Sequence, residues 1–108
     1  MEEKSVFEIL DFVGLTAGTN KDVYLWDIHT CVETCDAFIA IVDYPALGLG
    51  YELGVAVEKL SKPTLALAHK DALVTRLVLG INKPNYQFIR YDSLDEVPHL
   101  IQKFIATL

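Results

Sequence analysis

The chain alternates between continuous apolar runs and segments whose apolar residues recur at a helical period. Residues 36–43 read Asp-Ala-Phe-Ile-Ala-Ile-Val-Asp, an apolar run closed by carboxylates, which is typical of a strand buried on both faces. Residues 63–69 form a second run of this kind. Residues 5–13 and 86–91 are rich in β-branched and aromatic side chains, so the pattern predicts four strands.

The segments between these strands have the 3.6-residue period of amphipathic helices. The longest of them follows Asn20, a suitable N-cap residue. A polar, glycine-containing stretch over 44–50 indicates a loop before the next helix. The predicted helices span residues 21–35, 51–60 and 72–79, and a last helix capped by Ser93 or Asp95 ends near residue 108.

Strands that alternate with helices at this spacing indicate parallel βαβ units. Right-handed crossovers then place helices on both faces of the sheet. The expected fold class is therefore α/β, an open parallel sheet of about four strands in three layers of the flavodoxin or Rossmann type. The 108 residues are expected to form a single domain. Ligands of such sheets lie beyond the carboxyl ends of the strands, which directs attention to residues 43–54.

Composition narrows the functional classes. A net charge of −6 without any run of Lys or Arg argues against binding a nucleic-acid polymer. No stretch is apolar for long enough to span a membrane, and the acidic N-terminus lacks the apolar core of a signal peptide, so we expect a cytoplasmic protein. Cys31 and Cys35 are then expected to be reduced, buried thiols. Only His29 lies near them, so we expect no metal site and no cofactor.

The candidate chemistry lies where the first apolar run turns into a helix. Glycines at 48 and 50 would permit positive φ and let a ligand approach the backbone, although an ordinary tight turn is the alternative. Gly54 would let the helix pack tightly. Glu52 is predicted in the first helical turn, where free N–H groups and the macrodipole would keep its carboxylate ionised. Such a carboxylate could attack an electrophilic carbon, or it could only stabilise the helix.

Residues 34–56 closely resemble the nucleoside 2-deoxyribosyltransferase superfamily, most of all the branch that contains the 2′-deoxynucleoside 5′-phosphate N-hydrolases. The resemblance is carried by the apolar strand after Asp36 and by Gly50-Tyr-Glu-Leu-Gly54. Upstream, Val23-Tyr-Leu-Trp-Asp27 is similar to the acidic helix start of that family. The resemblance covers residues 5–105.

This resemblance implies cleavage or transfer of the N-glycosidic bond of a 2-deoxyribonucleoside or its 5′-monophosphate. Glu52 would be the nucleophile, forming a covalent ester through an oxocarbenium-like transition state, and Asp27 would assist departure of the base. Neighbouring subunits complete the site in related enzymes, so we expect a homo-oligomer whose other partner is a small deoxynucleoside or deoxynucleotide. The residues expected to contact the substrate are Asp43, Pro45, Gly48, Gly50 and Tyr51.

Three departures from the family pattern shape these expectations. The chain starts at what resembles the family's second strand. Ala46 stands where the hydrolases have Ser and the transferases Asp. The gap from Asp27 to Asp36 is one residue longer, which would rotate a helical side chain by about 100° and turn Asp27 from the site unless the helix bulges. A non-catalytic nucleotide-binding domain and an oligomerisation module therefore stay open as alternatives.

Overall fold

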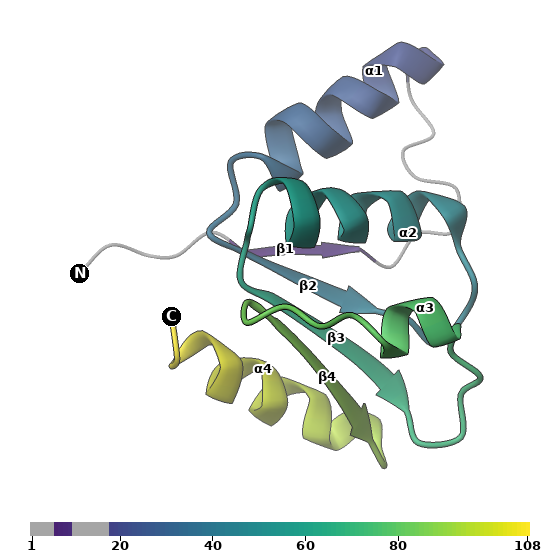
Figure 1. Ribbon diagram of the computed structural model, residues 1–108, viewed down its shortest axis with the longest axis vertical. Helices are drawn as coiled ribbons and strands as arrows, with labels where there is room; N and C mark the ends of the chain where they lie inside the picture. The colour runs from purple at the N-terminus through teal and green to yellow at the C-terminus, as the bar shows by residue number, and fades with distance from the viewer. Residues whose placement is uncertain (1–5, 10–17) are drawn as a thin grey trace.

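A computed structural model describes residues 6–9 and 18–108 of the chain (Figure 1). In chain order, the first elements are β1 (Val6–Ile9), α1 (Asn20–Tyr24), the π-helical segment η1 (Leu25–Val32), β2 (Ala37–Ile41), α2 (Leu47–Gly54) and the π-helical segment η2 (Val55–Lys59). They are followed by β3 (Thr64–His69), α3 (Arg76–Leu79), β4 (Tyr86–Tyr91), the 3₁₀ turn η3 (Leu94–Glu96) and α4 (Val97–Ile105).

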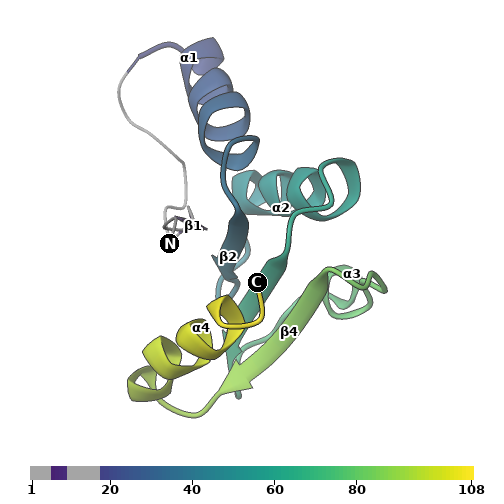
Figure 2. The same cartoon turned by 90° about the vertical axis from the view of Figure 1, so that its left-hand side faces the viewer.

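The strands form one parallel sheet in the order β1-β2-β3-β4. Phe38 of β2 lies opposite Thr64 of β3, and Thr64 lies opposite Tyr86 of the edge strand β4. Helices α1 and α2 lie on one side of this sheet and α4 on the other (Figure 2). The α/β class with helices on both faces of a parallel sheet is therefore confirmed.

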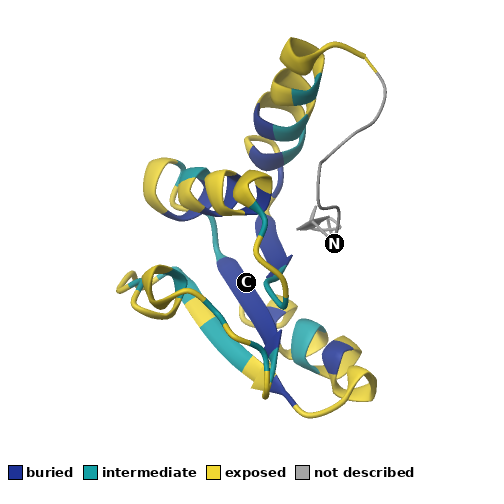
Figure 3. Cartoon of the chain, turned by 90° about the vertical axis from the view of Figure 1, so that its right-hand side faces the viewer, coloured by how far each residue is buried: buried dark blue, intermediate teal, exposed yellow. Residues whose placement is uncertain are grey.

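Alternate residues of β2 feed two separate hydrophobic cores. Phe38 and Ala40 face the first core, which η1, α2 and η2 cover. Ile39 faces the second core together with Leu65 and Leu67 of β3, beneath α4. The dark blue of β2 and β3 in Figure 3 shows how completely these strands are enclosed. This two-sided burial explains why their sequences are continuously apolar rather than alternating.

Element boundaries differ from the sequence-based prediction at several points. Residues 6–9 of the first predicted strand are confirmed, and its residues 10–13 lie outside the described part of the chain. Thr19, not Asn20, caps α1: its side chain accepts from Asp22 N–H at 3.2 Å, and the Asp22 carboxylate accepts from Thr19 N–H at 3.0 Å. This reciprocal capping box satisfies two N–H groups at the helix start.

Helix α2 begins at Leu47, four positions earlier than predicted, so its glycines are helical rather than part of a loop. The low helix propensity of glycine is overridden by packing, because Leu49 and Leu53 both bury their side chains in the first core. Further along the chain, α3 is shorter than predicted and starts after its cap Thr75. In the part of the chain that the structure describes, no helix has the length and apolar character needed to cross a membrane.

Candidate active site

The site is built around two carboxyl groups on neighbouring helical segments. Asp27 lies in η1 and Glu52 lies in α2, which packs against η1 in the first core. Glu52 is only 5% exposed, whereas Asp27 is half-buried. Their side chains share a hydrogen bond. Because an ionised carboxylate only accepts hydrogen bonds, this contact requires a proton on one of the two groups.

Burial, followed by the negative charge of Asp27 and the hydrogen bond with it, raises the pKa of Glu52 to about 8. Glu52 Oε2 is enclosed and accepts no hydrogen bond from the residues that the structure describes. The expectation of an ionised Glu52 in the first helical turn is therefore wrong. Glu52 is the sixth residue of α2, beyond the reach of the free N–H groups at its start. Burial and the neighbouring carboxylate therefore favour the protonated form of Glu52 at neutral pH.

The π-helical geometry of η1 brings Asp27 to this site despite the longer gap that follows it. In this segment the N–H of Glu33 donates to the carbonyl of Ile28 at 2.9 Å, five residues back rather than four. A π-helical turn accommodates one extra residue without changing the direction of the residues before it. The expected rotation of Asp27 away from Glu52 is therefore not observed, because the helix bulges.

The thiol of Cys31 lies near Asp27 and Glu52, and the charges of both carboxyl groups act on it. Burial raises its pKa, and the charges of Asp27 and Glu52 raise it further. Cys35 is fully buried and donates from Sγ to the carbonyl of Val32 at 3.0 Å. Both cysteines are free thiols, as predicted, although Cys31 is half-buried rather than buried. Cys31 is therefore a neighbour of the carboxyl pair.

The glycines of α2 have no structural reason to be glycines. A Cβ added at Gly48, Gly50 or Gly54 would meet nothing within 4 Å. Among the described glycines only Gly18 has positive φ, so the predicted positive φ at 48 and 50 and the tight packing at 54 are both wrong. Each glycine costs about 1 kcal/mol relative to alanine in a helix. These three glycines therefore lower the stability of α2 and leave its backbone uncovered.

The start of α2 also lacks a side-chain cap. Ala46 is the N-cap residue and makes no side-chain hydrogen bond to the helix. Pro45 before it is exposed, and Tyr51 is 57% exposed, so neither packs into the core. The first-turn N–H groups of an uncapped helix favour an anion from outside the chain.

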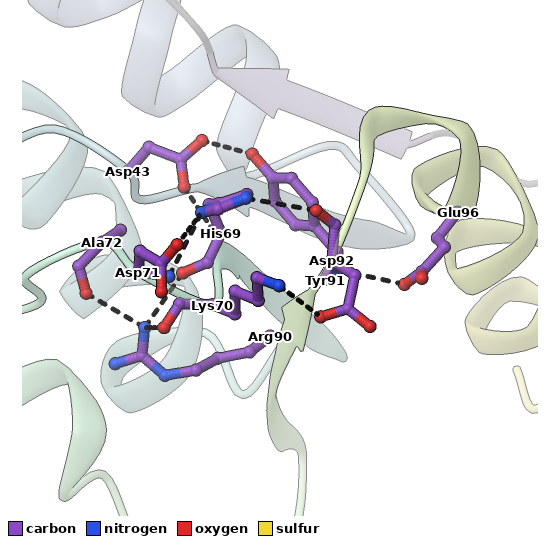
Figure 4. Close-up of polar contacts among 9 residues, drawn as sticks. All are labelled: Asp43, His69, Lys70, Asp71, Ala72, Arg90, Tyr91, Asp92 and Glu96. Atoms are coloured by element: carbon purple, nitrogen blue, oxygen red, sulfur yellow. Dashed lines mark hydrogen bonds and ion pairs between the residues drawn. The ribbon is translucent and has the colours of Figure 1, made fainter.

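Asp43, which is expected to contact substrate, accepts two hydrogen bonds from the protein. Its Oδ1 accepts the backbone N–H of His69 at 2.6 Å, and its Oδ2 accepts the hydroxyl of Tyr91 (Figure 4). The hydrogen bond to Asp43, followed by burial, raises the pKa of Tyr91 to about 12. Sequence reasoning missed Tyr91 and His69, although both end parallel strands and the carboxyl ends of such strands share one edge of the sheet.

In the part of the chain that the structure describes, no group of three or more His, Cys, Asp or Glu side chains is arranged to hold a metal ion. The groups at the pair are two carboxyls, of which Glu52 has the raised pKa. That combination is what general acid catalysis and nucleophilic attack by a single pair of residues require.

Comparison with family models finds no match. Curated relatives are about one third identical to this chain over the aligned residues. The protein named "Putative 2'-deoxynucleoside 5'-phosphate N-hydrolase 1" of Thermofilum pendens is 34% identical over 80 residues, covering 72% of this chain and 54% of that protein. Proteins of the same name from Syntrophotalea carbinolica and Methanosarcina mazei are 33% identical over 84 and 91 residues, covering 78% and 83% of this chain and 58% and 55% of theirs.

The fold and the carboxyl pair define an α/β protein with a two-carboxylate site on one face of a parallel sheet. The chain is a distant homologue of these relatives, and the resemblance to the 2′-deoxynucleoside 5′-phosphate N-hydrolase branch of the nucleoside 2-deoxyribosyltransferase superfamily is confirmed. The chain spans little more than half the length of the curated relatives that it matches.

Proposed function

We propose that this protein cleaves or transfers the N-glycosidic bond of a 2-deoxyribonucleoside or its 5′-monophosphate, with Glu52 as nucleophile and Asp27 as acid. The observation that carries the proposal is the buried carboxyl group of Glu52 beside Asp27, on two helical segments that pack together in the first core. The names of the relatives, which refer to 2′-deoxynucleoside 5′-phosphates, support the substrate class.

The short separation favours a retaining mechanism. Retaining glycosidases hold their two carboxyl groups about 5–5.5 Å apart, whereas inverting enzymes leave about 6.5–9.5 Å for a water molecule. The direct side-chain interaction of Asp27 with Glu52 corresponds more closely to the retaining arrangement. Direct attack by a carboxylate, with a covalent intermediate, suits this geometry.

The single proton of the pair can serve both steps. Its transfer from Glu52 to Asp27 leaves a Glu52 carboxylate, which attacks C1′ while the bond from C1′ to the base nitrogen breaks and Asp27 protonates the departing base. A water molecule then attacks C1′ of the ester and gives a proton to Asp27, and Glu52 leaves as a carboxylate. The pair again holds one proton, and a base in place of water would complete a transfer.

The open backbone of α2 suits the rest of such a substrate. Gly48 and Gly50 are exposed and leave room beside the helix, which would let a sugar or 5′-phosphate lie against the backbone. The uncapped first turn after Ala46 would then supply N–H donors to a phosphate. The site has no hydroxyl at 46 to share that task.

Release of free base from the four deoxynucleoside 5′-monophosphates and the matching deoxynucleosides tests the proposal. We expect release by the wild-type protein and a loss of about a hundredfold or more in Glu52→Gln and Asp27→Asn. Glu58→Gln is the matched control, because Glu58 is an exposed glutamate that pairs with Lys83 at 3.2 Å. Mass spectrometry of quenched reactions should find a 2-deoxyribosyl ester on Glu52. Equal rates in wild type and Glu52→Gln would disprove the enzymatic role.

A homo-oligomer is the second part of the proposal. Large apolar side chains are exposed on α1 and η1, where Leu25 is 41% and Trp26 50% exposed, and at the start of α2, where Leu47 is 96% exposed. Contact with a second copy would cover them. Sedimentation of wild type and Trp26→Ser should show a dimer that the substitution weakens, and a monomeric wild type at all concentrations would contradict it.

Two non-catalytic functions compete with this proposal. A domain that only binds nucleotides would show ligand binding without base release, and the missing hydroxyl at Ala46 favours this alternative. An oligomerisation module would show neither binding nor release. Calorimetry with the same nucleotides, run beside the base-release assay, distinguishes all three.

A further inference from the structure

A cavity lies beyond the carboxyl ends of β2, β3 and β4. It has a volume of about 520 Å³, within the range of small-molecule sites. Neither Asp27 nor Glu52 lines it, so it is distinct from the carboxyl pair. Its lining residues are Asp43, Tyr44, His69, Asp71, Ala72, Tyr91, Asp92, Ser93 and Leu94.

The floor of this cavity is held in place by hydrogen bonds between the strand ends (Figure 4). Asp43 is fixed by the His69 N–H and by the Tyr91 hydroxyl. The His69 ring accepts from Asp71 N–H through Nδ1 at 3.1 Å, so its Nε2 carries the hydrogen and donates to the Asp92 carbonyl at 3.1 Å. Both ring nitrogens are therefore committed, and the cavity is preorganised.

The cations near the cavity, Arg90 and Lys70, are each bound to another group of the protein. Arg90 Nη1 donates to the carbonyls of His69 and Ala72, each at 3.0 Å, and closes the loop after β3. Lys70 pairs with Asp92 Oδ1 at 3.7 Å. Neither cation lines the cavity.

The lining therefore offers acceptors and aromatic surfaces. Of its three aspartates, Asp92 pairs with Lys70, whereas Asp43 and Asp71 face no lysine or arginine among the lining residues. Each carboxylate oxygen has a second acceptor site, so Asp43 can accept from a ligand while it keeps its two protein donors. Tyr44, which is 80% exposed, and Tyr91 supply ring surface. A phosphate would be repelled, whereas a flat ligand with N–H donors would be attracted.

We propose that this cavity binds an amino-substituted heteroaromatic molecule of the free nucleobase class, with its amino group on Asp43 and its ring beside Tyr44. The geometry is that of a planar donor held between an anchored carboxylate and an exposed aromatic ring. The inference does not depend on N-glycosidic cleavage, since it rests on the cavity alone. If cleavage is also confirmed, the cavity would hold the kind of base that the reaction releases.

Titration of the ¹⁵N-labelled full chain with adenine and with unsubstituted purine tests this site. Purine has the same ring system but lacks the amino group, so only adenine should bind strongly. We expect saturable shifts of the amides of His69 and Asp92 with adenine and binding at least about tenfold weaker with purine, the loss expected for one hydrogen bond to a charged group.

Variants separate this site from the carboxyl pair and from unfolding. Asp43→Asn and Tyr44→Ala should weaken adenine binding, whereas Glu52→Gln and the exposed control Asp95→Asn should leave it unchanged. Tyr44 is exposed, so its variant tests the site even if Asp43→Asn does not fold. The proposal is overturned if adenine shows no saturable binding, if adenine and purine bind equally, or if Glu52→Gln abolishes the binding.

Discussion

The carboxyl groups of Asp27 and Glu52 meet between two helical segments and share one hydrogen bond, although the spacing between Asp27 and the following strand predicts that they point apart. The π-helical turn of η1 explains why the two side chains meet despite this spacing. It absorbs one residue, and as a result a buried glutamate acquires a second carboxyl group as its neighbour.

Protonation of Glu52 should make the stability of the protein depend on pH. Its pKa rises from 4.5 to about 8 on folding, so between these values the folded state binds more protons than the unfolded state. The free energy of unfolding should therefore be highest below about pH 4.5 for this group and should fall as pH rises through about 8, by a total on the order of 1 kcal/mol or more.

Urea denaturation of wild type and Glu52→Gln from pH 5 to pH 9 measures this dependence. Glutamine cannot ionise, so the variant should lose most of the decrease, while Glu58→Gln should keep it. A wild-type stability that rises over this interval, or an unchanged slope in Glu52→Gln, would contradict a buried, protonated Glu52.

Deletion of Thr30 should remove the π-helical turn and keep the carboxyl pair. Thr30 is exposed within η1, and one residue fewer lets the hydrogen bonds return from five to four residues back. Because Asp27 keeps its direction, the pH dependence of stability should persist, with Thr30→Ala as the matched control. If the deletion variant loses the pH dependence while Thr30→Ala keeps it, the π-helical turn does not position Asp27 by absorbing one residue.

Replacing Gly50 by alanine should separate stability from binding. The free energy of unfolding should rise by up to about 1 kcal/mol, because nothing obstructs a Cβ there. Nucleotide binding should weaken if the exposed backbone receives the substrate. Gly54→Ala, at the far end of α2, is the control and should raise the melting temperature without affecting binding. Unchanged nucleotide affinity in Gly50→Ala would remove the functional reason for this glycine.

A serine at position 46 should restore a helix cap. Ala46→Ser places a hydroxyl beside the uncapped N–H groups of α2 and should stabilise the protein by about 0.5–1 kcal/mol, measured by denaturation. Calorimetry should also show tighter binding of deoxynucleoside monophosphates than in wild type, with no gain for the nucleosides. An equal gain for both ligands would mean that this hydroxyl does not reach a phosphate.

Removing the hydroxyl of Tyr91 should weaken the carboxyl edge of the sheet. Tyr91→Phe deletes the donor to Asp43 and leaves the packed ring, so we expect a loss of about 1–3 kcal/mol in the free energy of unfolding. Tyr44→Phe is the control, because the Tyr44 side chain is exposed. Equal stability of Tyr91→Phe and wild type would show that the bond contributes nothing.

The strands at 37–41 and 64–69 were predictable because burial on both faces requires a continuous apolar run. The strand at 86–91 is only partly buried, and it was predictable from its aromatic and β-branched residues. The start of α2 was not, since it depends on the burial of Leu49 and Leu53 rather than on local propensity. The reason is tertiary packing, which no window of sequence contains.

The candidate site divides in the same way. Glu52 and Asp27 could be singled out from local patterns and from the family resemblance, but their shared proton depends on how η1 and α2 pack. The bonds of Asp43 to His69 and Tyr91 join residues 26 and 48 positions apart, so a local pattern around Asp43 could not show the two donors that the fold supplies.

The measurement that tests the central claim most directly is the rate of base release by wild type, Glu52→Gln and Asp27→Asn under identical conditions, with the quenched wild-type protein analysed for a deoxyribosyl adduct. The account predicts release by wild type, an adduct on Glu52, and near-complete loss of both in Glu52→Gln. Release that is equally fast in all three proteins, or its absence from wild type over the whole set of nucleotides and nucleosides, would contradict it.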